Sequence, residues 1–147
     1  MAYFQEGDVF GGESRGDTAL QLHVYSLETG KSQMIVENPE VKSFCWTNQH
    51  CLLYAFNGLT PQKTAYDYYY EKPDIYEASL GSKSAKLLIS EGYDPVASPN
   101  GRWIAFKGWS NTASKAGHER FGLYIYDRQA KKRTFLHALT QRAPTRI

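Results

Sequence analysis

The feature that most constrains this chain is a strand–turn–strand block that occurs three times. The block covers Leu22–Val36, Ile75–Ile89 and Leu123–His137, and the copies align without a gap at offsets of 53 and 48 residues. Each copy has an alternating strand, a polar turn and a second apolar strand. A spacing near fifty residues, filled only with strand and turn signals, is typical of β-propeller blades, because each four-stranded blade must bury its faces against neighbouring blades.

A second repeated element precedes the block. Residues Pro95 to Phe106 (PVASPNGRWIAF) form two short apolar runs joined by a turn, which predicts a β-hairpin. The structural turn residues are Ser98, Pro99, Asn100 and Gly101. Proline fixes φ there, whereas asparagine and glycine tolerate the positive φ of a tight reversal. The hairpin recurs in degraded form at Phe44 to Phe56, and its last residues recur at Met1 to Phe4.

These repeats predict a single all-β domain of about three four-stranded antiparallel blades. The units run approximately over residues 1–38, 39–91 and 92–139, and residues 140–147 begin a further blade. The first unit keeps only the end of its first hairpin. Propellers usually have four to eight blades, so three blades leave sheet faces and edges open. We expect either a second copy that completes a six-bladed ring as a homodimer, or a longer propeller of which this chain is a piece.

One segment resembles a known family. SPNGRWIAF (Ser98–Phe106), preceded by Tyr93-Asp94-Pro95 and followed by LYIYDR, is similar to the SPDG-containing, WD-like repeat of TolB-type propellers. Related repeats occur in the propeller domains of prolyl oligopeptidase-like peptidases. Asn100 replaces the usual Asp, and the second unit has WTNQHC where SPDG would stand. The motif makes a turn and carries no chemistry. The resemblance implies a scaffold that binds proteins or peptides, or an accessory domain of a hydrolase.

Charge and hydropathy limit the possible partners. The net charge of +2 is too small to indicate nucleic acid or an acidic membrane as partner, although residues 128–147 contain six Lys or Arg and no Asp or Glu. Of these, Lys131, Lys132 and Arg133 lie at a polar turn, where we expect them to be solvated. No apolar run is long enough to span a bilayer, and no secretion signal begins the chain. We expect a cytoplasmic protein, or a periplasmic one if the N-terminus is truncated.

The two cysteines, Cys45 and Cys51, flank the turn of the middle hairpin. With a short turn, Trp46 would face Cys51 and Cys45 would face Leu52, which places the two sulfurs on opposite faces of the sheet. We therefore expect free thiols. No cluster of cysteine and histidine at ligand spacing accompanies them, so we expect neither a metal site nor a cofactor.

Aromatic residues gather in the predicted inter-strand loops, most densely in TAYDYYYEKP. The candidate binding residues are Tyr66, Tyr68, Tyr69, Tyr70, Trp109, His118 and Phe121. Tyrosine suits recognition because it offers a large contact with one polar end at low entropic cost. Alternatively, these rings cover the blade below or pack against a neighbouring chain, since exposed aromatic patches are uncommon on monomers.

One segment invites a catalytic reading. Gly12-Glu13-Ser14-Arg15-Gly16 satisfies G-x-S-x-G, the nucleophile elbow of α/β-hydrolases, but no strand–helix–strand alternation follows it. A glycine-rich loop is the alternative. The sequence favours a non-enzymatic, protein- or peptide-binding scaffold that acts through its inter-strand loops. The second hypothesis is a hydrolase-associated propeller or small hydrolase that uses Ser14, and the third is a truncated relic that only self-associates.

Overall fold

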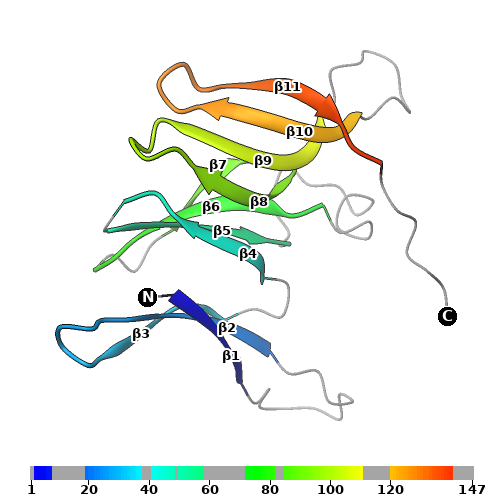
Figure 1. Cartoon of the computed structure of the whole chain (residues 1–147). Coiled ribbons are helices and arrows are strands. Elements are labelled where there is room, and N and C mark those ends of the chain that lie inside the picture. Colours follow the sequence, from blue (N-terminus) through cyan, green and yellow to red (C-terminus); the bar gives the residue numbers. More distant parts are fainter. Residues whose placement is uncertain are drawn as a thin grey trace, which may run out of the picture.

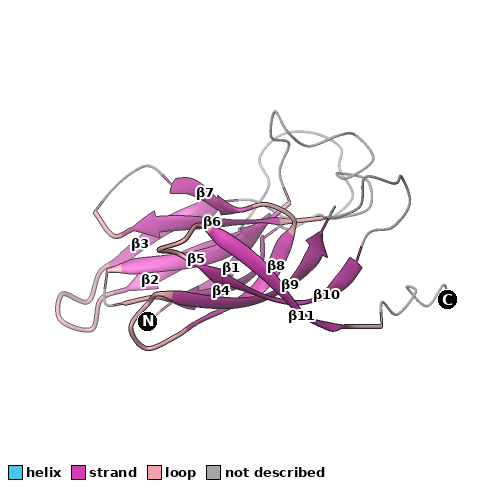
Figure 2. Cartoon of the chain, turned by 90° about the horizontal axis from the view of Figure 1, so that it is seen from above, coloured by secondary structure: helices cyan, strands magenta, loops and turns pink. Residues whose placement is uncertain are grey.

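Three antiparallel sheets are stacked face to face in the computed structural model (Figure 1). The structure describes residues 2–7, 19–37, 41–48, 50–57, 72–81, 85–110 and 120–140. Within these residues the chain forms eleven strands and their turns, and no helix occurs (Figure 2). The predicted all-β fold class is therefore confirmed.

Each sheet is built from strands that are consecutive in the chain. The first sheet contains β1 (Ala2–Gly7), β2 (Ala19–Tyr25) and β3 (Ser32–Glu37). The second contains β4 (Val41–Trp46), β5 (Cys51–Phe56), β6 (Asp74–Ser79) and β7 (Ala85–Ile89). The third contains β8 (Gly92–Ala97), β9 (Trp103–Ser110), β10 (Arg120–Asp127) and β11 (Lys132–Ala138). Strand order in each sheet follows chain order, as in a blade that winds outward from its first strand.

Two apolar cores hold the stack together, one on each side of the second sheet. We call the face of a sheet that points toward the next sheet in chain order its front face, and the opposite face its back face. Because side chains alternate along a strand, neighbouring residues of β5 enter different cores. Leu52 and Tyr54 pack on Leu22 of the first sheet. The core between the second and third sheets consists of Leu53, Ala55, Ile75, Ile89, Ile104, Phe106 and Tyr124.

Asparagine side chains stabilise the hairpin turns of the second and third sheets, from different positions in the two turns. Asn100 Oδ1 accepts a hydrogen bond from the backbone N of Arg102 at 3.1 Å, and Gly101 has a φ of +71°. In the second sheet, Asn48 Oδ1 accepts from the backbone N of His50 at 2.8 Å and of Cys51 at 2.9 Å. In both hairpins the asparagine side chain therefore supplies hydrogen bonds that a backbone turn would otherwise make. The turn of the second sheet does so without proline or glycine.

The register of β4 and β5 corrects the prediction for the two cysteines. The turn joins Thr47 to Cys51, and the backbone N of Thr47 donates to the Cys51 carbonyl at 3.0 Å. Cys45 consequently pairs with Leu53 and not with Leu52. Paired residues share a face, and so do residues two apart on a strand, so Cys45 and Cys51 lie on the same face. The prediction of opposite faces was wrong by one residue of register, whereas both thiols are free as expected.

Candidate interaction surfaces

No other described sheet of the chain packs on the front face of the third sheet, which carries a row of apolar side chains (Figure 1). Val96 on β8 pairs with Ala105 on β9, which in turn pairs with Ile125 on β10, so these three side chains form one row. Val96 is 65% exposed, and Trp103, two residues before Ala105, is 36% exposed. Ala105 and Ile125 are partly buried. The centre of this face is therefore a flat row of apolar side chains that water reaches.

The same face of the second sheet shows what normally covers such residues. Aligning LYAF of β5 with WIAF of β9 makes Leu53 the counterpart of Trp103, and Ala55 the counterpart of Ala105. Leu53 and Ala55 are fully buried because the third sheet packs over them. The third sheet thus carries apolar residues at the positions of a covered blade face, and among the described residues no further sheet follows it.

Three aromatic rings cluster at the edge of this face, where β9 ends and β10 begins. Tyr93 lies 5.6 Å from Trp109 and 6.4 Å from Phe121 between ring centroids, and Trp109 lies 5.2 Å from Phe121. Lys107 Nζ is 3.0 Å from the carboxylate of Asp94 and 5.9 Å from the Tyr93 ring. Burial among these rings raises the pKa of Tyr93. We call Tyr93, Trp109 and Phe121 the aromatic cluster.

The structure brings together two of the predicted binding residues. Trp109 belongs to β9 and is 6% exposed, and Phe121 belongs to β10 and is partly buried. Both rings lie in the aromatic cluster, where they pack on each other and on Tyr93. The sequence had no signal for Tyr93 as their partner beyond its place before the SPNG turn. The other candidates, Tyr66, Tyr68, Tyr69, Tyr70 and His118, lie outside the described residues, as does Ser14.

Arg133 fastens the third sheet to the connection that leads out of the second sheet. Its guanidinium donates to the carbonyl oxygens of Ser90 at 2.7 Å and Trp109 at 2.9 Å. Its Cζ atom lies 4.9 Å from the ring centroids of both Phe106 and Tyr124. Burial lowers the pKa of this guanidinium. The prediction that Arg133 is a solvated turn residue was wrong, because its side chain turns inward to satisfy backbone carbonyls.

A bidentate ion pair joins the second sheet to the third. Arg128, directly after β10, donates to Glu77 Oε2 at 2.5 Å and to Glu77 Oε1 at 2.9 Å. Glu77 lies on the front face of the second sheet and its side chain is 8% exposed. The hydrogen bonds that its guanidinium donates to the Glu77 carboxylate raise the pKa of Arg128. Sequence reasoning counted Arg128 only as part of a basic end and missed this contact.

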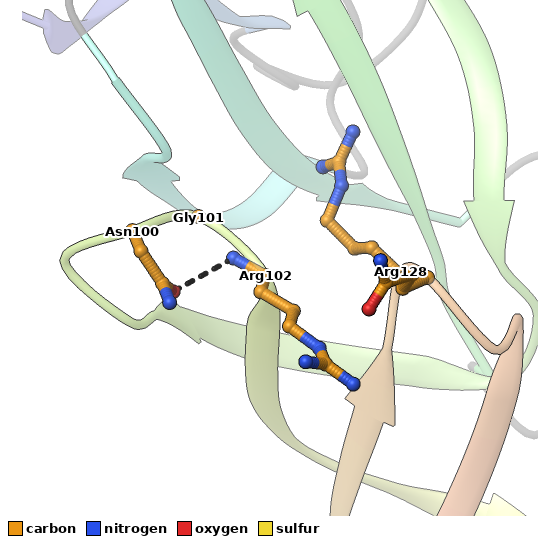
Figure 3. A pocket seen from close by; sticks show the side chains of 5 residues that line it. Asn100, Gly101, Arg102 and Arg128 are labelled. Atoms are coloured by element: carbon orange, nitrogen blue, oxygen red, sulfur yellow. Dashed lines mark hydrogen bonds between the residues drawn. The ribbon is translucent and has the colours of Figure 1, made fainter.

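A shallow depression of about 440 Å³ lies at the hairpin-turn end of the third sheet (Figure 3). Its lining residues are Asn100, Gly101, Arg102, Arg128 and Gln129. Figure 3 shows the two guanidinium groups extending in different directions. Arg102 pairs with Asp127 at 3.1 Å, and Arg128 is held by Glu77. Because both cations are neutralised and diverge, the depression does not converge on an anion.

The described part of the chain contains no other constellation with a defined chemistry. In that part, no group of three His, Cys, Asp or Glu side chains is placed to hold a metal ion. Nor does it contain a helix of sufficient length and hydropathy to cross a membrane. Three polar residues, Asn57, Lys72 and Asp74, are each 3% exposed at the loop end of the second sheet. Asp74 Oδ1 accepts a hydrogen bond from the backbone N of Glu91 at 2.8 Å, so this group helps to hold the connection between two sheets.

Solved structures of two other proteins share this arrangement of sheets. TolB from Acinetobacter baumannii superposes with a TM-score of 0.52 at 16% identity, over 82% of this chain and 26% of TolB. The tricorn protease superposes with a TM-score of 0.52 at 18% identity, over 79% of this chain and 11% of the protease. No family description and no curated protein matches the sequence. The predicted resemblance to TolB-type propellers is therefore confirmed as a likeness of fold, and the chain spans about a quarter of TolB.

Proposed function

We propose that this propeller-type chain is a non-enzymatic protein-binding module, and that it binds through the front face of its third sheet. The supporting observation is the contrast between equivalent positions. Leu53 and Ala55 are fully buried beneath the next sheet, whereas no further described sheet packs over Trp103 and Ala105 at the same positions. The Arg102 guanidinium lies 4.6 Å from the centroid of the Trp103 ring. Exposed contiguous apolar surface on a soluble domain marks an interaction site.

The occupant that fits this face is another propeller-type sheet. The row of Val96, Ala105 and Ile125 is flat and apolar, like the faces that pack about 10 Å apart between the sheets of this chain. Charged side chains lie toward its margins, where Asp127 pairs with Arg102 and Lys107 pairs with Asp94. An apolar centre with a charged margin is the usual composition of a protein interface.

The inter-strand loops are the second part of the proposal. We predict that the loop containing Tyr66, Tyr68, Tyr69 and Tyr70 holds a protein or peptide, as propeller loops commonly do. Pull-down of a candidate peptide by the full chain, compared with a variant in which these tyrosines are serine, tests the loops independently of the sheet face.

The hydrolase alternative is tested by a serine-directed fluorophosphonate probe. A non-enzymatic module should not react with the probe above the level of the denatured chain. Labelling of the folded chain that disappears in Ser14→Ala would instead favour a serine hydrolase and would contradict the proposal.

The face itself is tested by a single charge. A second copy of the chain supplies propeller-type sheets, so we expect the purified chain to self-associate in sedimentation equilibrium at concentrations up to about 100 µM. Val96→Lys should weaken this association by at least about tenfold, because burying the valine contributes roughly 1.5 kcal/mol or more per contact and a buried lysine is unfavourable. Val96 is already exposed, so the variant should fold normally.

Leu87→Lys is the matched control. Leu87 is 38% exposed on β7 of the second sheet, away from the third sheet's front face, so its replacement should leave the association unchanged. A wild-type chain that stays monomeric, or equal effects of the two lysines, would refute the proposed surface.

A further inference from the structure

Two positions of the repeated block lie at the junctions between sheets. The gapless alignment makes residues 24, 77 and 125 equivalent, and likewise residues 27, 80 and 128. The first set is Val24, Glu77 and Ile125, one on each of β2, β6 and β10. The second set is Leu27, Leu80 and Arg128, each after the end of one of these strands. The structure shows how the two sets meet.

At the junction of the first and second sheets the meeting is apolar. Val24, on the front face of the first sheet, is buried in the first core, and Leu80 of the second sheet packs against that same core. At the junction of the second and third sheets the meeting is ionic, because Glu77 on the front face accepts both hydrogen bonds from Arg128 of the following sheet. At each junction, therefore, the residue from the first set and the residue from the second set that belongs to the next sheet take part in the same contact region: one apolar core at the first junction and one ion pair at the second.

The remaining members of the two sets have no such contact among the described residues. Ile125 lies on the front face of the third sheet, in the row with Val96 and Ala105. Leu27 lies at the tip between β2 and β3 and is 81% exposed, the most exposed large apolar side chain described in this structure. Ile125 and Leu27 are both apolar, so they could form an apolar contact like the core that contains Val24 and Leu80.

We infer that the partner of the front face is a second copy of this chain, docked through the back face of its first sheet, with Leu27 of each copy packed on Ile125 of the other. This inference rests on the proposed function, since it names the occupant of that same face. The back face of the first sheet offers further apolar surface, because Met34, paired with His23, is 48% exposed.

The contact has to form between two chains. Within one chain the first and third sheets lie on opposite sides of the second sheet, each against its own core, so Leu27 and Ile125 of the same copy do not meet (Figure 1). Two copies related by a two-fold axis make the contact twice. The three sheets of each copy then give six, which is within the usual four to eight blades of a closed propeller.

The test transplants the ion pair of the second junction to the closing one. Ile125→Glu alone places a carboxylate against leucine and should weaken self-association by about 100-fold, while Leu27→Arg alone should weaken it by about tenfold. The double variant Ile125→Glu/Leu27→Arg restores a Glu–Arg pair at both contacts and should return to within about tenfold of wild type. An equimolar mixture of the two single variants should form heterodimers, and the double variant should gain a salt dependence that the wild type lacks.

The outcomes separate this inference from the function on which it rests. Far-UV circular dichroism confirms that each variant is folded, and Leu87→Arg serves as the control for an added charge elsewhere. A wild-type chain that remains monomeric overturns the proposed function and this inference together. Self-association that Val96→Lys weakens, but that Leu27→Arg leaves unchanged or the double variant does not restore, overturns this inference alone, because the front face then binds something other than the first sheet.

Discussion

The ion pair between Glu77 and Arg128 yields a double-mutant cycle whose outcome depends on burial. Replacing both residues with their apolar counterparts, Glu77→Val and Arg128→Leu, gives the second junction the residues found at the first, where Val24 and Leu80 share one apolar core. Buried ion pairs can often be exchanged for apolar residues at little net cost, whereas removal of one partner leaves an uncompensated charge. We therefore expect the single variants to be much less stable than the double variant.

The magnitudes follow from the exposure of the two side chains. Arg128→Leu leaves the Glu77 carboxylate, 8% exposed, without its two hydrogen bonds and should destabilise the fold by about 3–5 kcal/mol. Glu77→Val should cost less, about 1–3 kcal/mol, because the Arg128 side chain is 28% exposed and can turn toward water. The double variant should lie within about 1 kcal/mol of wild type, so the coupling free energy should be at least about 3 kcal/mol.

Urea-induced unfolding followed by far-UV circular dichroism measures all four free energies of unfolding. The cycle is best measured in the Val96→Lys background at one protein concentration, because self-association would add its own stabilisation. Equal m-values across the cycle show that the four proteins expose the same surface on unfolding. Single effects that add to within about 0.5 kcal/mol would show that the two groups do not interact, and would refute this account of the second junction.

Three further perturbations test the fold. Gly122→Ala should cost roughly 1–3 kcal/mol in urea unfolding, because a Cβ there overlaps the His137 carbonyl oxygen of the neighbouring strand; an unchanged midpoint would contradict that close approach. Asn48→Ala should cost about 1 kcal/mol, since its Oδ1 satisfies two backbone N–H groups of the turn, and Asn48→Asp should retain most of the stability. Burial raises the pKa of Tyr54, so its contribution to stability is complete below the ordinary value near 10 and is lost as the pH rises above it; Tyr54→Phe should therefore melt at a higher temperature than wild type at about pH 11 but not at about pH 8.

The strands of this fold could be predicted from the sequence because their signals are local. Alternating apolar residues and turn chemistry within Leu123–His137 are sufficient to place β10, β11 and the turn between them. The repetition of that block adds the number of sheets. The prediction that Trp109 and Phe121 lie in an inter-strand loop was wrong, since β9 continues to Ser110 and β10 begins at Arg120. Trp109 packs on Tyr93 and Phe121 from two other strands, so no local pattern marks it as buried.

Turn length was the local property that the sequence did not determine. The side chain of Asn48 closes the β4–β5 turn over one residue fewer than Ser98–Trp103 needs in the third sheet. The shorter turn shifts the pairing by one residue, so Cys45 pairs with Leu53 and not with Leu52. Because side chains alternate between the two faces, this shift places Cys45 on the same face as Cys51. The contact of Glu77 with Arg128 was missed for another reason. Its signal is the alignment of two positions across all three repeats, which only the observed contact makes meaningful.

The chemistry of the two internal junctions also bears on which sheet follows which in an assembled ring. When two copies associate, the first sheet of one copy competes with the third sheet for the front face of the second sheet. If the first sheet of one copy displaced the third sheet from that face, Leu27 would lie over Glu77. The Glu77 carboxylate would then be buried without Arg128, at a cost of several kcal/mol. The ion pair therefore disfavours exchanged assemblies and leaves Ile125 as the surface open to Leu27.

It follows that the Glu77→Val/Arg128→Leu double variant should keep its stability but lose this selectivity. Its second and third sheets both present an apolar residue at the shared position, as the first sheet does with Val24. We expect sedimentation velocity and native mass spectrometry to show a broadened set of oligomers for this variant, against a single dimer for wild type. Adding Val96→Lys should remove the dimer but not the exchanged species, because exchange uses the front face of the second sheet. A double variant that forms only the wild-type dimer would show that packing of the remaining core, and not the ion pair, selects the order of the sheets.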